Sequence, residues 1–154
     1  MKRLVIDANI AAKWYLPEAD SETAEMLFAD GLEFHAPDFL ATEFANIYWK
    51  HSVAGRTSLD AWRKASRQLK KAIPYWHSDE QLHDQALELA ITHKHPIFDC
   101  IYLALAIQID GIVVTADKQF CNQFEPTEHR LRVMALHHVM AAKTASEGGL
   151  IIPQ

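Results

Sequence analysis

Cysteine is scarce in this 154-residue sequence, which contains only Cys100 and Cys121 and has no CxxC pair. This scarcity excludes a disulfide-stapled secreted scaffold, and we expect both cysteines to be small buried residues in a reducing compartment. No apolar run reaches the length of about 18 residues that a membrane span needs. Residues 1–20 also lack the apolar core and cleavage site of a signal peptide. We therefore expect a cytoplasmic protein without a membrane segment.

Glycine is also rare, with five residues, and the sequence has no GxxxxGK motif. The absence of this motif excludes the nucleotide hydrolases that bind phosphate in such a loop. Basic residues are outnumbered by acidic ones, and the formal net charge is −5. An acidic balance argues weakly against nucleic acid as a partner.

The basic residues are unevenly distributed. Residues 50–71 contain a single acid, Asp60, and seven basic residues: Lys50, Arg56, Arg63, Lys64, Arg67, Lys70 and Lys71. The segment is therefore either a solvated helix face or a cationic patch on an acidic protein. The choice depends on whether a functional site lies beside it.

The order of apolar and amphipathic segments predicts an α/β fold in one domain. Strands are expected at residues 3–6, near 32–36, at 112–115 and at 131–136. Helices are expected at 8–16, from Asp20 to Gly31, from Pro37 to near Gly55, after a capping box at Thr57, from 78 to about 93, and at 97–109 with Gly111 as a left-handed cap. Strands that are apolar throughout predict a mainly parallel sheet covered on both faces. We assign residues 1–145 to this domain and residues 146–154 to a loose tail.

Two aspartates follow the expected strands directly. Asp7 comes after the strand LVI, and Asp117 comes after the strand IVVT. Ligands of such sheets gather at the carboxyl ends of the strands, so both residues are candidate site residues. Each aspartate taken alone can equally be the N-cap of the next helix.

Two further acids occupy positions that ought to be apolar. Glu43 lies on the helix stripe formed by Leu40, Phe44 and Ile47, and Asp99 is the single charged residue of the helix at 97–109. A buried ionised carboxylate is costly unless it is paired or bound to a metal. A buried hydrogen bond or a contact with the helix dipole is the alternative for each one alone.

Taken together, the four acids favour a metal site. If Asp7, Glu43, Asp99 and Asp117 converge, their mutual repulsion requires a cation. Oxygen ligands of this kind suit Mg²⁺ or Mn²⁺. Such an ion supports hydrolysis of a phosphodiester by water.

The chain also resembles the PIN-domain nucleases, in particular the VapC-type toxins of bacterial toxin–antitoxin pairs. The resemblance rests on four segments in the family's order: VIDANIAAKWYLPE at 5–18, PDFLATEFANIYWK at 37–50, HPIFDCIYLALA at 95–106 and VVTADKQF at 113–120. It implies a PIN-like three-layer fold and a Mg²⁺-dependent endoribonuclease, with Mn²⁺ as a substitute ion. It also implies that the four acids bind the metal and that Asn9 and Thr115 support them.

The resemblance carries further expectations about partners. It implies an RNA substrate such as tRNA or rRNA, a second copy of the chain, and an antitoxin protein. Some members of the family carry one more acid two residues beyond the last aspartate, where this chain has Gln119. An RNA substrate gives the basic segment a role, and we interpret Arg56, Arg63, Lys64, Arg67, Lys70 and Lys71 as candidate phosphate contacts.

Several alternatives were weighed against this interpretation. A haloacid dehalogenase-type phosphatase needs an aspartate where Asn9 lies, and a receiver domain needs one after a middle strand, where we predict helix. The nine histidines show no HExxH motif or zinc-ligand spacing, which favours surface or hydrogen-bonded histidines. The aromatic residues are mainly core or dimer contacts in this interpretation. The remaining alternative is a catalytically silent PIN-like module that binds RNA or a partner.

Overall fold

A five-stranded parallel sheet forms the centre of the protein in the computed structural model, which describes residues 2–28 and 31–145. The strand order is β3-β2-β1-β4-β5. The strands are β1 (Lys2–Ile6), β2 (Leu32–Pro37), β3 (Tyr75–His77), β4 (Ile112–Thr115) and β5 (Val133–Ala135). β1 lies in the middle, with Val5 in register with His35 of β2 and Val113 of β4. The predicted parallel sheet is confirmed, and its central strand is the first in the sequence.

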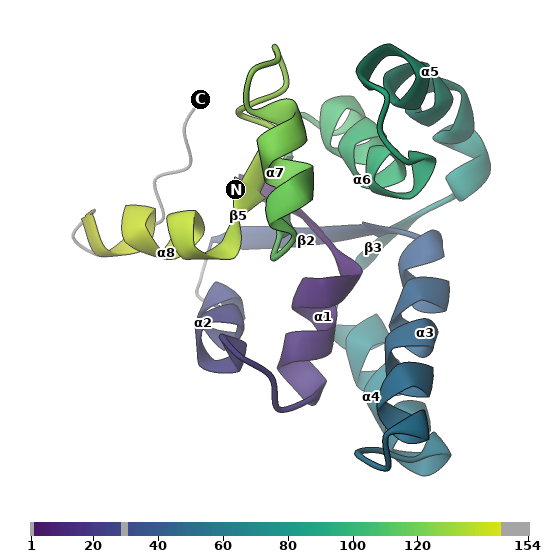
Figure 1. Cartoon of the computed structure of the whole chain (residues 1–154). Coiled ribbons are helices and arrows are strands. Elements are labelled where there is room, and N and C mark those ends of the chain that lie inside the picture. The colour runs from purple at the N-terminus through teal and green to yellow at the C-terminus, as the bar shows by residue number, and fades with distance from the viewer. Residues whose placement is uncertain (1, 29–30, 146–154) are drawn as a thin grey trace.

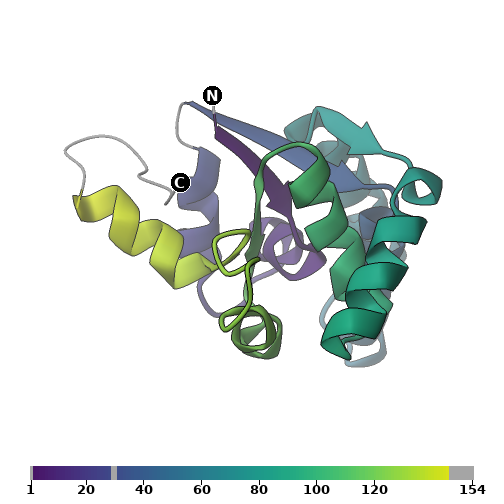
Figure 2. The same cartoon turned by 90° about the horizontal axis from the view of Figure 1, so that it is seen from above.

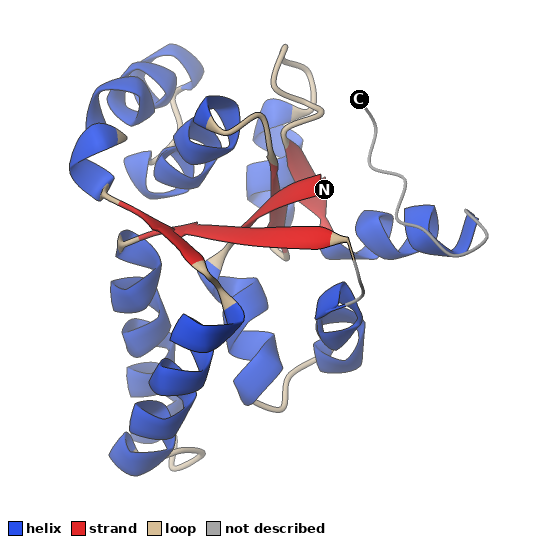
Figure 3. Ribbon diagram, turned by 180° about the vertical axis from the view of Figure 1, so that it is seen from behind, coloured by secondary structure: helices blue, strands red, loops and turns tan. Residues whose placement is uncertain are grey.

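Helices cover both faces of this sheet, which makes three layers (Figure 1 and Figure 3). The helices are α1 (Ala8–Tyr15), α2 (Ser21–Glu25), α3 (Phe39–Val53), α4 (Leu59–Ala72), α5 (His83–His93), α6 (Ile97–Gln108), α7 (Lys118–Phe124) and α8 (Leu136–Ala145). In Figure 1, α5 and α6 lie above the strands and α1 and α2 lie below them. Helices α3 and α4 run side by side away from the sheet. Seen from above, α8 lies at the opposite end of the molecule from α5 and α6 (Figure 2). The predicted three-layer α/β arrangement is confirmed.

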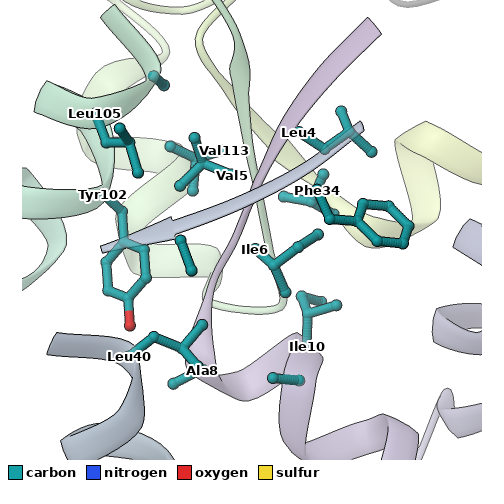
Figure 4. Packing of buried hydrophobic residues seen from close by; sticks show 14 of the residues in the cluster. Leu4, Val5, Ile6, Ala8, Ile10, Phe34, Leu40, Tyr102, Leu105 and Val113 are labelled. Atoms are coloured by element: carbon teal, nitrogen blue, oxygen red, sulfur yellow. The ribbon is translucent and has the colours of Figure 1, made fainter. Parts of the chain in front are cut away.

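The core lies between the sheet and these helices. Leu4, Val5 and Ile6 of β1 are fully buried, and so is every residue of α6 from Leu103 to Ala106. A helix buried all round is expected in the centre of such a fold, because a strictly amphipathic helix would present polar groups to the core. Figure 4 shows Tyr102 within this packing, with its hydroxyl directed toward the end of the core where Leu40 and Ala8 lie. The buried helix predicted at 97–109 is therefore confirmed.

Gly111 does not have the predicted left-handed cap conformation. The residue with positive φ after α6 is Asp110, at φ 53°. Gly111 instead lies against β1, where an added Cβ would be 2.8 Å from the carbonyl oxygen of Arg3. A glycine is required here for the close approach of two backbones rather than for its dihedral freedom.

Other predicted boundaries also need correction. The helix expected from Asp20 to Gly31 ends at Glu25 and continues as a 3₁₀ turn over Met26–Phe28. The cap of α4 is Ser58 rather than Thr57, because Ser58 is extended and its hydroxyl accepts a 3.1 Å hydrogen bond from the Ala61 amide. The segment expected to start a helix at 78 is a 3₁₀ turn over Asp79–Gln81. Strand β3 and helices α7 and α8 were not predicted, and the predicted tail at 146–154 lies outside the described residues.

Both cysteines are free, as their scarcity predicted. Cys100 is buried as expected, but Cys121 is only partly buried, so the expectation that both would be buried is wrong for Cys121. Burial raises the pKa of both thiols, to about 12 for Cys100 and about 11 for Cys121. Neither thiol is a nucleophile at neutral pH. In the described parts of the chain, no helix has both the length and the apolar character that crossing a membrane requires.

Candidate active site at the carboxyl end of the sheet

The four predicted acids come from four different elements. Asp7 follows β1, and Asp117 lies two residues after β4, the strand paired with β1. Glu43 lies on α3, which begins where β2 ends, and Asp99 lies in the first turn of α6. Because β1, β2 and β4 are adjacent and parallel, their carboxyl ends bring Asp7, Glu43 and Asp117 to the same end of the sheet. The charge of Asp99 acts on both Asp7 and Glu43, so Asp99 lies near them.

Asp7 is held by side chains rather than by the helix that follows it. It occupies the N-cap position of α1 but makes no side-chain capping hydrogen bond, so the capping alternative is wrong for this residue. Its Oδ2 accepts hydrogen bonds from the Thr115 hydroxyl at 2.6 Å and from the Asn9 amide at 3.2 Å. Asn9 also donates to Thr115 Oγ1 at 3.2 Å. Asn9 and Thr115 therefore orient this carboxylate.

The pKa of Asp7 reflects where it is buried. Its residue surface is 5% exposed. Burial is the largest cause that raises its pKa, the charges of Glu43 and Asp99 raise it further, and the Thr115 hydrogen bond lowers it. The result is a pKa of about 7, against an ordinary value of 3.8. A carboxylate so perturbed is typical of a functional site.

Glu43 is oriented by a residue that the sequence did not single out. Burial raises the pKa of Glu43, and the charge of Asp99 raises it further. The hydroxyl of Tyr102, a fully buried residue of α6, donates a 2.6 Å hydrogen bond to Glu43 Oε1. This bond lowers the pKa of Glu43 in opposition to burial. Tyr102 and Glu43 are 59 positions apart, so no local sequence pattern indicated that they would pair.

Asp99 has a similar partner in His95. Nε2 of His95 donates to Asp99 Oδ2 at 2.6 Å, and the two residues are four positions apart. Burial raises the pKa of Asp99, the contact with His95 lowers it, and the charge of Asp117 raises it. His95 is itself buried, with its ring stacked on Phe120. The interpretation of this histidine as hydrogen-bonded is confirmed, and its spacing from Asp99 was visible in the sequence.

Asp117 caps the helix that follows it. Its Oδ1 accepts hydrogen bonds from the amides of Gln119 and Phe120, at 2.8 and 3.2 Å. The capping alternative is therefore correct for Asp117. These two hydrogen bonds satisfy Oδ1 and leave Oδ2 for another ligand.

The acids influence one another electrostatically. Asp7 experiences the charges of Glu43 and Asp99, and Asp99 experiences that of Asp117. Carboxylates linked through Asp99 in this way offer an all-oxygen donor set, which fits a hard divalent cation such as Mg²⁺. The ligand atoms of these acids are not tightly grouped, because no three of them lie within 4.8 Å of one another. Across residues 2–28 and 31–145, the only group of three that meets this condition is His93, Glu128 and His129. A wider acidic site suits an ion that keeps several waters.

The candidate RNA contacts lie on the surface. Arg56 precedes α4, and the other five lie on α4, all exposed: Arg63, Lys64, Arg67, Lys70 and Lys71. Arg63 pairs with Asp60 at 2.9 Å, and the buried side of the helix is formed by Ala65 and Leu69. Exposure is compatible with a solvated face and with a phosphate track alike, so this assignment stays a prediction.

Residues 4–123 match the PIN domain family. The chain belongs to this family. The match covers Asp7, Glu43, Asp99 and Asp117 in one continuous region. Within the family, this PIN domain is 35% identical over 127 residues to ribonuclease VapC3 of Pyrobaculum aerophilum, which covers 79% of this chain and 95% of that protein. The predicted VapC-type PIN domain is confirmed, and with it the interpretation of the chain as a nuclease toxin.

Solved structures agree with this PIN fold. PAE2754 from Pyrobaculum aerophilum aligns with a TM-score of 0.67 at 16% identity, over 94% of this chain and 91% of that one. VapC20 from Mycobacterium tuberculosis, a toxin that cleaves the sarcin-ricin loop, aligns at 0.64 and 16% identity over 79% and 95%. A toxin–antitoxin complex from Klebsiella pneumoniae aligns at 0.55 and 12% identity over 86% and 97%. At these identities the likeness is one of fold.

Membership in the PIN family also removes the receiver-domain alternative. The reason against it from the sequence, that the middle of the chain is helical, was incomplete. The middle of this PIN domain does contain a strand, β3, and an acid follows it at Asp79. That acid accepts a 2.9 Å hydrogen bond from the Phe39 amide. Asp79 therefore stabilises the start of α3.

Proposed function

We propose that this VapC-type ribonuclease cleaves RNA internally with Mg²⁺, for which Mn²⁺ substitutes, and that Asp7, Glu43, Asp99 and Asp117 hold the ion. The proposal rests on four acids near the carboxyl end of the sheet, where burial and, to a smaller extent, the charges of Glu43 and Asp99 raise the pKa of Asp7 to about 7. Burying such acids together without a cation is unfavourable. When bound, a divalent ion would lower the pKa of a water molecule and stabilise charge on the leaving oxygen.

The residues of the chain have separate roles in this proposal. Thr115 and Asn9 fix the orientation of Asp7, and His95 fixes that of Asp99, so that neither acid has to reorganise when the ion arrives. Tyr102 holds Oε1 of Glu43. We assign to Oε2 of Glu43 the acceptance of a proton from the attacking water, because the raised pKa of this acid suits proton transfer near neutral pH.

The partners follow from the same assignment. We infer that the substrate is a structured RNA such as tRNA or rRNA, met in the cytoplasm, with the basic residues before and on α4 holding its phosphates. We also infer a cognate antitoxin and a homodimer. The ribonuclease relative supports RNA as the substrate, and the structural likeness to a toxin–antitoxin complex supports the antitoxin.

The decisive experiment incubates the tag-free protein, freed of any antitoxin, with total RNA, purified tRNA and purified rRNA. Each reaction contains Mg²⁺ or Mn²⁺, beside an EDTA control, the Asp99→Asn variant, and Asp84→Asn as an exposed acid on α5. We expect cuts that need the metal, survive in Asp84→Asn and disappear in Asp99→Asn. Water as the nucleophile leaves 5′-phosphate and 3′-hydroxyl ends, which end-labelling detects.

Three outcomes would contradict the proposal. Equal metal-dependent cleavage by Asp7→Asn, Glu43→Gln and Asp99→Asn would remove the acids from the site. Cyclic phosphate ends would show that the 2′-hydroxyl of the RNA attacks instead of water. RNA binding without any cleavage would favour the silent binding module.

A further inference from the structure

Three metal-ligating side chains meet on the face of the protein formed by α5 and the segment between α7 and β5. His93 is the last residue of α5, and Glu128 and His129 lie in that segment. One ligand atom from each residue lies within 4.8 Å of the other two, and no other group of three in residues 2–28 and 31–145 meets this condition. His93 is 35 positions before Glu128, the residue that precedes His129 in the sequence, so the three residues do not form a local metal-binding motif.

The backbone around these side chains is well fixed. The carbonyl of His93 accepts a 2.7 Å hydrogen bond from Nε2 of Gln123, a residue of α7. The Thr127 hydroxyl donates to the Phe124 carbonyl at 2.7 Å and accepts from the His129 amide at 3.1 Å. These bonds hold both sides of the site in place before any ligand is bound, which lowers the entropic cost of binding.

An aromatic ring supports both imidazoles. Phe124, fully buried, contacts the ring of His93 edge-to-face at 5.1 Å and that of His129 at 6.4 Å between centroids. The two imidazoles themselves lie 5.5 Å apart with planes at 81°. Rings that are packed in this way cannot turn freely, so their nitrogens keep a defined direction.

The donor set is characteristic of a borderline transition metal. Two imidazoles and one carboxylate bind Zn²⁺ as three protein ligands, with a water as the fourth. A tetrahedral zinc site with bonds of about 2.0–2.1 Å has ligand atoms about 3.3 Å apart. Nε2 of His129 lies 3.5 Å from Oε1 of Glu128, close to that separation.

We propose that His93, Glu128 and His129 form a second metal site, which binds Zn²⁺ or a similar borderline divalent cation and is separate from the four acids. The bound ion clamps the end of α5 to the segment between α7 and β5. Phe124, which contacts both ligand rings, also contacts His95 edge-to-face at 5.5 Å. The clamp therefore steadies the same packing that holds His95 against Asp99.

The test measures Zn²⁺ binding to the tag-free full chain by calorimetry, with Mg²⁺ in large excess so that the acidic site is occupied by a hard ion. Co²⁺ then replaces Zn²⁺ as a spectroscopic probe, because its visible absorption reports nitrogen ligands in a tetrahedral site. We expect one high-affinity Zn²⁺ per chain and a rise of several degrees in the unfolding temperature. The readout does not involve RNA cleavage, so it fails or succeeds independently of the proposed nuclease.

Three variants make the assignment specific. Glu128→Gln changes a side chain that is 74% exposed, so folding is not at risk, and it should weaken Zn²⁺ binding at least tenfold. His129→Gln should abolish the Co²⁺ absorption. His83→Gln, an exposed histidine on the same helix as His93, should leave both unchanged. Zn²⁺ affinity equal in wild type and Glu128→Gln would overturn the proposal, as would the absence of binding to wild type.

Discussion

The hydroxyl of Tyr102 donates a 2.6 Å hydrogen bond to Glu43, and this bond joins the buried helix α6 to the acid carried by α3. Tyr102 lies three residues after Asp99 on the same helix. Helix α6 therefore carries one acid of the site and the group that restrains another. The geometry of the proposed site thus depends on a side chain that belongs to the hydrophobic core.

Replacing Tyr102 with Phe should separate these two roles. The ring remains in the core, so the free energy of unfolding should fall by only about 1 kcal/mol, the usual worth of a hydrogen bond. Loss of the donor raises the pKa of Glu43, because this bond now lowers it. The acidic limb of the cleavage pH profile should move to higher pH, and kcat/KM at neutral pH should fall by about tenfold to a hundredfold. An unchanged pH profile would mean that Glu43 does not titrate in catalysis.

Asp7 makes the stability of the metal-free protein depend on pH. Its pKa is about 7 when folded and near 3.8 when unfolded, so the folded state binds more protons between these values. The contribution of Asp7 to the free energy of unfolding is fully present below about pH 4 and is lost as the pH rises through 7. Asp7→Asn should therefore stabilise the protein by roughly 1–4 kcal/mol at pH 8 in EDTA, and by far less at pH 4. Urea unfolding at both pH values tests this, with Glu88→Gln, an exposed acid, as the control. Equal stability of wild type and variant at pH 8 would contradict it.

His95 should govern metal affinity through Asp99. The contact with His95 lowers the pKa of Asp99, so His95→Gln raises it and lets protons compete with the ion. We expect the Mg²⁺ concentration for half-maximal cleavage to rise about tenfold to a hundredfold, with a larger effect at pH 6 than at pH 8. The matched variant His83→Gln should behave as wild type. A uniform loss of activity with no change in Mg²⁺ dependence would assign His95 a purely structural role.

The basic face of α4 should bind phosphates. Reversing two charges with Arg63→Glu and Lys70→Glu should weaken RNA binding and reduce the slope of log K against log salt by about 1 to 2. The same charge change outside α4, made with Lys94→Glu and Arg130→Glu, controls for net charge. If both pairs of substitutions alter the salt slope equally, α4 has no special role.

Gly111 should be intolerant of a side chain. In Gly111→Ala the new Cβ would meet the Arg3 carbonyl at 2.8 Å, and the backbone of β1 cannot yield without disturbing the sheet. We expect a loss of roughly 1–3 kcal/mol in the free energy of unfolding. Gly55 has positive φ, at 72°, but open space around it, so Gly55→Ala should cost about 1 kcal/mol from the dihedral angle alone. A smaller loss at 111 than at 55 would contradict the steric argument.

The sequence predicted the parts of the fold whose signals are local. The strand before Asp7 and the helix around Asp99 are apolar runs, and their burial follows from composition. Strand β3 was missed because its three residues, Tyr75–His77, show no alternation that would distinguish them from a loop. The left-handed residue after α6 was misplaced, since a glycine beside an aspartate usually has the positive φ.

The charged residues of the candidate site were predictable from the sequence, but the residues that orient them were not. Carboxylates on apolar helix faces are conspicuous, so Glu43 and Asp99 could be singled out as candidates without a structure. Tyr102 could not, because a tyrosine in a buried helix is ordinary and its partner is remote in sequence. The cluster of His93, Glu128 and His129 likewise depends on how α5 packs against the chain after α7.

The position of β1 has a consequence for the protein in motion. β1 pairs with strands on both sides, whereas β3 and β5 are the edges of the sheet. Edge strands open first in the small fluctuations that expose amides to hydrogen exchange, and a central strand exchanges only when the whole domain opens. The carboxylate with the most perturbed pKa in the site is thus attached to the slowest-opening strand. Strands β3 and β5 can therefore open transiently while the structure around Asp7 stays intact.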